Sequence, residues 1–562
     1  MSIVKNIEKQ IKELIGKAVN KAKEAGTLNF SLVPEYVLEV PREKVHGDFA
    51  ANIAMLMAKE AKMPPRKIAE IIVNSFDRQG TLVERIEIAG PGFINFYLDH
   101  SWVYRVLPII LEEGDDYGKS NFGGGKKVQV EFVSANPTGV LHMGNARGAA
   151  LGDSLASVLD AAGFDVTREF FINDAGNQIE KFARSLEARY LQLLGEDVPF
   201  PEDGYHGLDI IDTMQGLIDL QGDKYKSMDA ELRREFLVKY ALEEKISNIR
   251  KTLEDFGVYY DVWFSEQTLH DNGEVTNTVE QLKKDGHIYE KEGALWFNTT
   301  QFGDEKDEVV VRSNGVPTYF AADIAYHKNK YNRGFEQVIN IWGADHHGHV
   351  PRMKGAVKAL GYDPDQLTVI LMQLVRLFRG GEILRMSKRT GTYVTLNELM
   401  EEVGRDAARY FFVMRSPDSQ MDFDLDLAKS ESADNPVYYV QYAHARICSI
   451  LRQAEEMGYT LPKGSEHSLD YQVLSDPSEI MLLRKMADLP DEIVSAAQNL
   501  APHRMTGFAH DLASLFHVFY TNCRVLTDEP EVRNARLLLT KATGICIKNV
   551  LKLIGVSAPE RM

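Results

Sequence analysis

Cysteine is scarce in this sequence, and long apolar runs are missing. The chain of 562 residues holds three cysteines, Cys448, Cys523 and Cys546, and none of them stand in C-x-x-C spacing. This argues against a disulfide framework and a structural zinc site, and it favours a reducing environment. The N-terminal stretch is charged throughout and lacks the apolar core of a signal peptide, and no window approaches the ~18 apolar residues of a membrane span. We therefore expect a cytoplasmic protein with no membrane partner.

Positive charge is also in short supply. Lys and Arg number 64 against 82 Asp and Glu, so the formal net charge is −18. Non-specific binding to nucleic acid needs a net basic footprint, so we expect no DNA partner, although local basic patches can still bind a shaped RNA. The sequence contains no internal repeat or low-complexity tract. Its length predicts three or four globular domains of roughly 100–200 residues each.

The stretch from Val128 to Gly163 predicts a strand, a turn and a helix. Residues 128–133 alternate with the period of a strand, and Ser-Ala-Asn-Pro-Thr-Gly at 134–139 is typical of a turn. From Gly144 the apolar residues recur at helical spacing until Gly163, which stands where a C-cap glycine belongs. Because a helix N-terminus presents free N–H groups and a positive dipole end, this crevice is expected to receive a phosphate.

Two motifs suggest a family. His142-Met143-Gly144-Asn145 resembles the HIGH signature of class I aminoacyl-tRNA synthetases, and the longer run ANPTGVLHMGNARGA resembles the form of that signature in arginyl-tRNA synthetases. A lone H-x-G-N tetrapeptide is a weak signal. Farther along, Arg385-Met386-Ser387-Lys388-Arg389 resembles the KMSKS loop of the same class. The alternative, an ordinary basic surface loop, fits poorly with both motifs occurring in order.

The neighbourhood of the second motif is also informative. The apolar run over 368–378 predicts a strand or hairpin that leads into the loop, and Thr395 with Glu398 predicts a capping box that opens the next helix. Two residues depart from the commonest family pattern, because Asn145 replaces the second His of HIGH and Arg385 replaces the first Lys of KMSKS. Asn still forms hydrogen bonds but carries no charge, and Arg keeps the charge with a different geometry.

The resemblance covers essentially the whole chain and implies its architecture. It implies an α/β catalytic domain with a doubly wound, Rossmann-like parallel sheet at 119–430, with insertions around 196–300. A small α/β N-terminal domain at 1–118 and an all-α helical domain at 431–562 complete it. The local patterns predict a helix over 3–25, a parallel strand over 166–172, a helix capped at Asn173 or Asp174, and only helices after Gly404.

Acidic and aromatic residues suggest the amino-acid substrate. Tyr319 and Asp323 share a face of a predicted helix, and Glu131 ends the strand beside the turn. An unpaired buried carboxylate is costly, and the guanidinium of arginine would pair with it and stack on an aromatic ring. With the resemblance, we expect an arginine site that comprises Glu131, Ser134, Asn136, His142, Tyr319 and Asp323. The alternative for Asp323 is a salt bridge to a nearby Lys or Arg.

The resemblance also implies ATP as a substrate, with Mg²⁺ bridging its phosphate oxygens. The expected ATP-binding residues are Thr138, Gly144, Gly343, Asp345, His346, Met386 and Ser387, and the expected catalytic residues are His142, Asn145, Arg385 and Lys388. His346, His347 and His349 could suggest a metal, but no fixed fourth ligand is evident, so we prefer nucleotide contacts and expect no metal site in the protein itself.

The two outer domains are expected to bind tRNA. Phe93 and Asn95 in the N-terminal domain are candidates for stacking on and hydrogen-bonding an unpaired base. Tyr438, Gln441, Tyr442 and Arg446 fall on one face of a predicted helix and would offer aromatic platforms to the anticodon. For Phe93 and most of these tyrosines, a place in the hydrophobic core is an equally good interpretation.

The resemblance therefore implies an arginine–tRNA ligase. Such an enzyme activates L-arginine with ATP, releases pyrophosphate and transfers arginine to the 3′-terminal adenosine of tRNA(Arg). We expect it to act as a monomer. Two alternatives remain open, a class I synthetase for another amino acid and an inactive synthetase-like RNA-binding protein.

Overall fold

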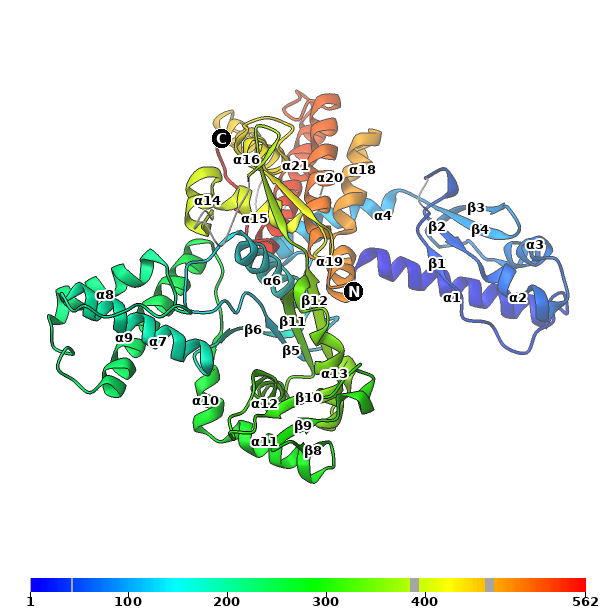
Figure 1. Ribbon diagram of the computed structural model, residues 1–562. Helices are drawn as coiled ribbons and strands as arrows, with labels where there is room; N and C mark the ends of the chain where they lie inside the picture. The colour runs from blue at the N-terminus through cyan, green and yellow to red at the C-terminus, as the bar shows by residue number, and fades with distance from the viewer. Residues whose placement is uncertain (1, 42–43, 385–393, 460–468) are drawn as a thin grey trace.

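A five-stranded parallel sheet lies at the centre of the molecule (Figure 1). The computed structural model describes residues 2–41, 44–384, 394–459 and 469–562. The strand order is β12-β11-β5-β6-β7, and the pairings between neighbours are all parallel. The strands are β5 (Lys127–Glu131), β6 (Asp165–Ile172), β7 (Val262–Ser265), β11 (Gln337–Gly343) and β12 (Leu367–Met372).

The connections of this sheet run in two directions from β5. Helix α6 (Met143–Ala161) links β5 to β6 on one side, whereas β11 and β12 lie on the other side of β5. The chain order therefore reverses between β5 and β11, with Glu131 aligned beside Asn340. Ligands of doubly wound sheets bind at such a switch point, outside the carboxyl ends of the strands. The predicted doubly wound fold is confirmed.

Insertions extend the catalytic part between its strands. Helices α7 (Asn177–Leu193), α8 (Leu208–Gln221) and α9 (Ala230–Asp255) pack around their own small core, which includes Phe182, Tyr190 and Leu237. The predicted cap of α7 is wrong, because the helix begins at Asn177 after Gly176. Asp174 instead accepts hydrogen bonds from the Ser265 hydroxyl at 2.6 Å and the Gln267 amide at 3.0 Å.

A second unit precedes β11 and covers one end of the sheet. It contains the antiparallel sheet β10-β9-β8 together with helices that pack on it and on β11 (Figure 1). Its elements, with the helix that follows β11, are α10 (Glu266–Asp271), α11 (Glu274–Lys284), β8 (Ile288–Lys291), β9 (Ala294–Phe297), β10 (Glu308–Val311), α12 (Tyr319–Asn332) and α13 (His349–Ala359). Glu292 and Gly293 form the hairpin turn between β8 and β9, and both residues have positive φ.

A hairpin leads the chain out of the sheet, as predicted from residues 368–378. Strand β13 (Val375–Arg379) pairs antiparallel with β14 (Glu382–Leu384) and parallel with β15 (Met421–Asp424). The expectation of helices alone after Gly404 is therefore wrong at β15. Met421 and Phe423 alternate with polar residues over a segment too short to be distinguished from a loop by sequence pattern.

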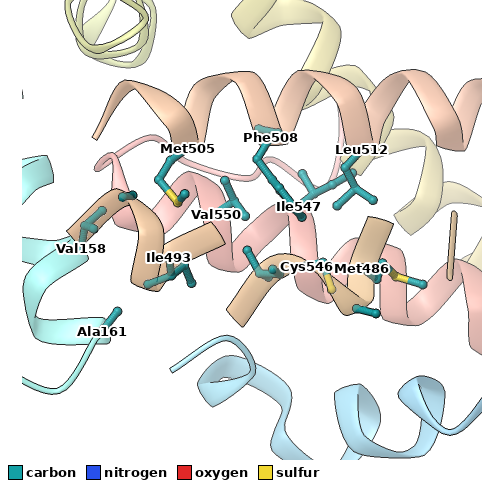
Figure 2. Close-up of a cluster of buried hydrophobic side chains, with 14 of the residues drawn as sticks. Val158, Ala161, Met486, Ile493, Met505, Phe508, Leu512, Cys546, Ile547 and Val550 are labelled. Carbon is teal, nitrogen blue, oxygen red and sulfur yellow. The ribbon is translucent and has the colours of Figure 1, made fainter. Parts of the chain in front are cut away.

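The carboxyl-terminal part is a helical bundle that packs on the back of α6. Its helices are α14 (Leu396–Val403), α15 (Arg405–Val413), α16 (Leu425–Lys429), α17 (Pro436–Glu456), α18 (Pro477–Ala487), α19 (Leu489–Gln498), α20 (His503–Asn522) and α21 (Pro530–Leu553). Figure 2 shows Val158 and Ala161 of α6 beside Ile493 of α19, next to buried side chains of α20 and α21. The helical part and the catalytic helix thus share one hydrophobic core.

The amino-terminal part is a small α/β module at the far end of the long helix α1 (Figure 1). Its sheet has the order β1-β2-β4-β3, and α4 and α5 connect it to the helical bundle. The elements are α1 (Ile3–Glu24), β1 (Leu38–Glu39), β2 (Phe49–Ala51), α2 (Ile53–Ala61), α3 (Pro65–Ser75), β3 (Val83–Ala89), β4 (Phe93–Leu98), α4 (Ser101–Tyr104) and α5 (Val106–Glu113). The predicted helix over 3–25 is confirmed, and β3 and β4 form an antiparallel pair around Gly90-Pro91-Gly92.

Candidate active site

The chain turns sharply where β5 ends at the switch point. Val133 and Ser134 both have positive φ, 68° and 39°, a conformation that is strained for residues other than glycine. The Ser134 hydroxyl donates to the Glu131 carboxylate at 3.0 Å and accepts from the Phe171 amide at 3.1 Å. These bonds hold the turn against both β5 and β6, so the strained backbone is fixed by its surroundings.

The next residues form the start of α6, and His142 caps it. His142 Nδ1 accepts a hydrogen bond from the Gly144 amide at 3.2 Å, and the Asn145 side chain accepts one from the His142 amide at 3.1 Å. A Cβ at position 144 would lie 3.2 Å from the His142 ring, so glycine leaves room for the imidazole. Asn145 thus completes a reciprocal capping box, a structural function that does not require the second His of HIGH.

The described residues that follow the KMSKS-like motif lie beside the HIGH-like motif. Thr395, which follows the KMSKS-like segment, forms a β-bridge with His142, and the Leu396 amide donates to the Leu141 carbonyl at 2.9 Å. On the other side, the segment leaves β14 after Leu384. Arg385, Met386, Ser387 and Lys388 lie outside the described residues. Thr395, the second described residue after them, lies beside His142.

The residues predicted to bind ATP lie around the ends of β5 and β11. Gly343 ends β11, and the short helix Ala344–His346 follows it. A Cβ at Gly343 would lie in contact with the Asp345 carboxylate, so glycine allows that side chain to turn back over the strand end. Asp345 and His346 are exposed, and Thr138 and Gly144 are half-buried in the turn and helix start. Gly343, Asp345 and His346 thus stand at the carboxyl end of β11, and Thr138 and Gly144 follow that of β5 in the chain.

Glu131 has an internal cation as its partner. Lys330 of α12, which is fully buried, donates to Glu131 at 2.5 Å and to the Asn340 side chain at 2.9 Å. We predicted that Glu131 has no cationic partner until arginine binds. This prediction is wrong, because Lys330 supplies a cation. The remaining oxygen of Glu131 accepts from Ser134, so the carboxylate stands at the edge of the turn. The assignment of Glu131 to the arginine site stays a prediction.

Asp323 has a different environment. Its carboxylate lies 3.1 Å from His349 Nε2, and neither a Lys nor an Arg side chain pairs with it among the residues that the structure describes. The alternative of a salt bridge to Lys or Arg is thus replaced by an imidazole contact. Tyr319 begins the same helix, is 40% exposed and lies against Gly176, where a Cβ would stand 3.4 Å from the tyrosine ring. Asn136 is exposed in the turn.

Sequence patterns did not reveal Glu266, a buried acid near Asp323. Glu266 begins α10 and is 3% exposed. Burial, followed by the charges of Asp323 and Asp174, raises the pKa of its carboxyl to about 7. Its position directly after a β-strand of the parallel sheet was the available signal, because such positions border ligand sites.

The predicted RNA-binding residues of the N-terminal module lie on the outer face of its sheet. Phe93 is half-buried, whereas its neighbours Ile94 and Phe96 are fully buried on the opposite face. A place in the hydrophobic core therefore describes Phe93 less well than it describes its neighbours. Asn95, on the same side of the strand as Phe93, is 4% exposed and leaves little surface for a ligand.

The predicted RNA-binding residues of α17 form a stacked row. The rings of Tyr438 and Tyr442 are 6.1 Å apart and nearly parallel, and the Arg446 guanidinium lies 4.7 Å from the Tyr442 ring centre. Gln441 differs, because its amide donates to Asp406 at 2.9 Å and to the Ser557 carbonyl at 3.0 Å. Its donors therefore hold the end of the chain in place, whereas the aromatic rings remain half-buried at the surface.

In the part of the chain that the structure describes, each helix is too short or too polar to span a bilayer. In these same residues, no group of three or more His, Cys, Asp and Glu side chains could hold a metal ion.

The chain matches three family models in series. They are the arginyl tRNA synthetase N terminal domain at residues 9–98, the catalytic domain of class I (R) tRNA synthetases at 106–201 and 218–446, and the DALR anticodon binding domain at 440–562. The fold resembles that of the Thermus thermophilus arginyl-tRNA synthetase, with a TM-score of 0.72 and 22% identity over 98% of this chain and 100% of that one.

Curated relatives match along the full length. The arginine–tRNA ligase of Heliobacterium modesticaldum is 64% identical over 564 residues, and that of Moorella thermoacetica is 64% identical over 562 residues. Each alignment covers 100% of both chains. With these matches, a doubly wound sheet and a capped HIGH-like helix start, the chain belongs to the arginyl-tRNA synthetase family.

Proposed function

We propose that the switch point between β5 and β11 activates L-arginine with ATP and that the same site then charges tRNA(Arg). In the first step an arginine carboxylate oxygen attacks the α-phosphate of ATP in line, forming arginyl-adenylate as the bond to pyrophosphate breaks. In the second step a ribose hydroxyl of the 3′-terminal adenosine attacks the arginyl carbonyl, and AMP leaves. No enzyme nucleophile is required, so catalysis depends on positioning and on charge stabilisation.

The observation that carries this proposal is the β-bridge between His142 and Thr395. His142 and the first amides of α6 would contact the α-phosphate oxygens, and Asn145 would keep the helix start in shape. Lys388 and Arg385, which precede Thr395 in the sequence, would meet the charge that develops on the leaving pyrophosphate. Met386 and Ser387 would contribute to the same nucleotide contacts. The bridge supports this assignment because Thr395, seven positions after Lys388, lies beside His142.

The nucleotide would lie across the ends of β5 and β11. Thr138, Gly144, Gly343, Asp345 and His346 are the proposed contacts for its phosphates, ribose and adenine. The donor chemistry also suits Mg²⁺, which favours carboxylate, phosphate and water oxygens and rarely needs a cage made by the protein alone. The phosphate oxygens of ATP would hold the ion, and Asp345, whose side chain is 83% exposed, remains a proposed nucleotide contact. When bound, the ion neutralises charge on the phosphate oxygens.

Arginine would lie between the turn and α12. Asp323 and Tyr319 would bind its guanidinium, while Glu131, Ser134, Asn136 and His142 would bind its remaining polar groups and fix its orientation. Phe93 and Asn95, and the row of Tyr438, Gln441, Tyr442 and Arg446, remain the proposed contacts for tRNA. We further propose domains at 1–118, 119–430 and 431–562 and a monomer that acts in the cytoplasm.

Substitution of Lys388 tests the proposed chemistry. We expect Lys388→Ala to lower the rate of ATP–pyrophosphate exchange by about 10²–10³-fold, with little change in arginine KM, because the lost charge acts on the transition state. The rate should be measured by pre-steady-state kinetics with tRNA present. Lys354→Ala, on the exposed side of α13, is the control and should retain the full rate. An unchanged rate in Lys388→Ala would refute the role.

A further inference from the structure

Ion pairs divide the carboxylates around α12 into two kinds. Glu131 pairs with Lys330, and Glu169 accepts two hydrogen bonds from Arg333 at 2.6 and 2.8 Å. Asp323 and Glu266, in contrast, have only histidine as a cationic partner among the described residues, His349 at 3.1 Å and His270 at 3.7 Å. The carboxylates that pair with a Lys or Arg of the protein are thus distinct from the carboxylates that are available to the guanidinium of a bound arginine.

Lys330 is completely enclosed. Its side chain has no solvent exposure, and its ammonium contacts Glu131, the Asn340 amide oxygen and the face of the Tyr326 ring at 4.3 Å. An ammonium has three donors, and these contacts provide a partner in three directions. A buried charge that is so fully satisfied holds its partner in one geometry, because any movement would leave a polar group without a partner.

A chain of hydrogen bonds extends from Lys330 to Asp323. His327 Nδ1 lies 2.8 Å from the Asp323 carbonyl, an acceptor, so this nitrogen carries the proton. His327 Nε2 then accepts from the Asn340 amide at 2.9 Å, which leaves the Asn340 oxygen to accept from Lys330. Burial keeps the imidazole neutral, since the pKa of His327 is well below its ordinary value. Each donor and acceptor in the chain is therefore assigned.

We infer that Lys330 is a positioning residue of the amino-acid site, which holds the Glu131 carboxylate toward the arginine and locks it to the helix that carries Asp323. This inference rests on the proposed function, because it assumes that Glu131 contacts arginine. In this arrangement the Glu131 carboxylate, whose charge is neutralised by Lys330, orients the substrate. Asp323 and Glu266 supply the negative charge that binds the guanidinium. Lys330 itself touches neither substrate.

The test compares Lys330→Met, Glu131→Gln and the double variant by ATP–pyrophosphate exchange with tRNA present. Lys330→Met keeps the length and apolar stem of the side chain but removes the ammonium. We expect it to raise arginine KM at least about tenfold and to change ATP KM by less than about twofold. Lys328→Met is the matched control on the same helix, because Lys328 donates to Gln281 alone among the residues that the structure describes, and it should leave both constants unchanged.

The double variant distinguishes positioning from general loss of stability. If Lys330 acts through Glu131, the double variant should have the arginine KM of Glu131→Gln alone, to within about twofold. A further rise of more than about threefold would overturn the inference, and so would a normal arginine KM in Lys330→Met.

Should Lys330→Met fail to fold, the comparison of the double variant with Glu131→Gln still decides the matter, because the neutral pair leaves no uncompensated charge. An unchanged arginine KM in Glu131→Gln would instead refute the proposed arginine site.

Discussion

Individual residues near the amino-acid site differ in how their charge is balanced. Lys330 neutralises Glu131, whereas Glu266 is buried beside Asp323 and Asp174 without such a cation. Its carboxyl pKa of about 7 lies above the ordinary 4.5, so the folded protein keeps a proton that the unfolded chain releases between these values. The stability of the fold should therefore fall as the pH rises through this window.

The same group predicts a pH dependence of substrate binding. A bound guanidinium favours the ionised carboxylate, so arginine KM should fall as the pH rises from about 6 to about 8. In Glu266→Gln this dependence should disappear, because an amide does not titrate in this range. Exchange kinetics at several pH values would measure arginine KM, with ATP KM as the internal control. An equally steep dependence in Glu266→Gln would contradict the assignment.

At the scale of elements, α6 can lie on β5 because of one small residue. A Cβ at Gly152 would stand 2.2 Å from the Phe132 ring, a distance that real contacts do not allow. We expect Gly152→Ala to destabilise the fold by about 1–3 kcal/mol, because either the ring or the helix must move. Thermal unfolding would measure this change.

A second helical glycine provides the matched control. Gly507 lies in α20, and a Cβ there would have no neighbour within 4 Å. Gly507→Ala should stabilise the protein by about 0.5–1 kcal/mol through helix propensity alone. Opposite signs for the two substitutions would show that packing determines the result at Gly152, and equal signs would contradict this explanation.

At the scale of the whole molecule, Arg409 joins parts that are distant in sequence. This fully buried residue of α15 donates to Asp153 of α6 at 2.5 Å, to the Ile554 carbonyl at 3.0 Å, and to the carbonyls of Phe256 and Gly257 at 3.2 Å each. It therefore connects the catalytic helix, the end of the insertion and the end of the helical bundle.

Removal of this connection should affect the stability of the entire protein. We expect Arg409→Met to lower the free energy of unfolding by about 3–5 kcal/mol, because three carbonyls and part of the Asp153 carboxylate lose their donor. Lys548→Met breaks an exposed pair with Asp115 and should change the melting temperature little. A melting temperature for Arg409→Met equal to that of the control would contradict the role of Arg409.

Several features were predictable because they depend on nearby residues. Thr395 with Glu398 does begin a helix, as predicted, and Asn435 caps α17 in a similar way, since a cap involves atoms within three residues. The alternation of residues 128–133 likewise predicted β5. The cap of α7 and strand β15 were not predictable, because Asp174 bonds to residues of another strand end and β15 is defined by its pairing with β13.

The amino-acid sequence by itself determined several local helices, strands and caps, the HIGH-like and KMSKS-like motifs and the family to which they point. Periodicity, turns and caps express preferences of neighbouring residues, so they can be recognised in the unfolded chain. Only the tertiary structure decided which cation faces Glu131, why Asn145 suffices beside His142, and how Thr395 reaches the helix start. Lys330 and Glu131 are 199 positions apart, and a contact of this kind exists only after the sheet has brought α12 across β5.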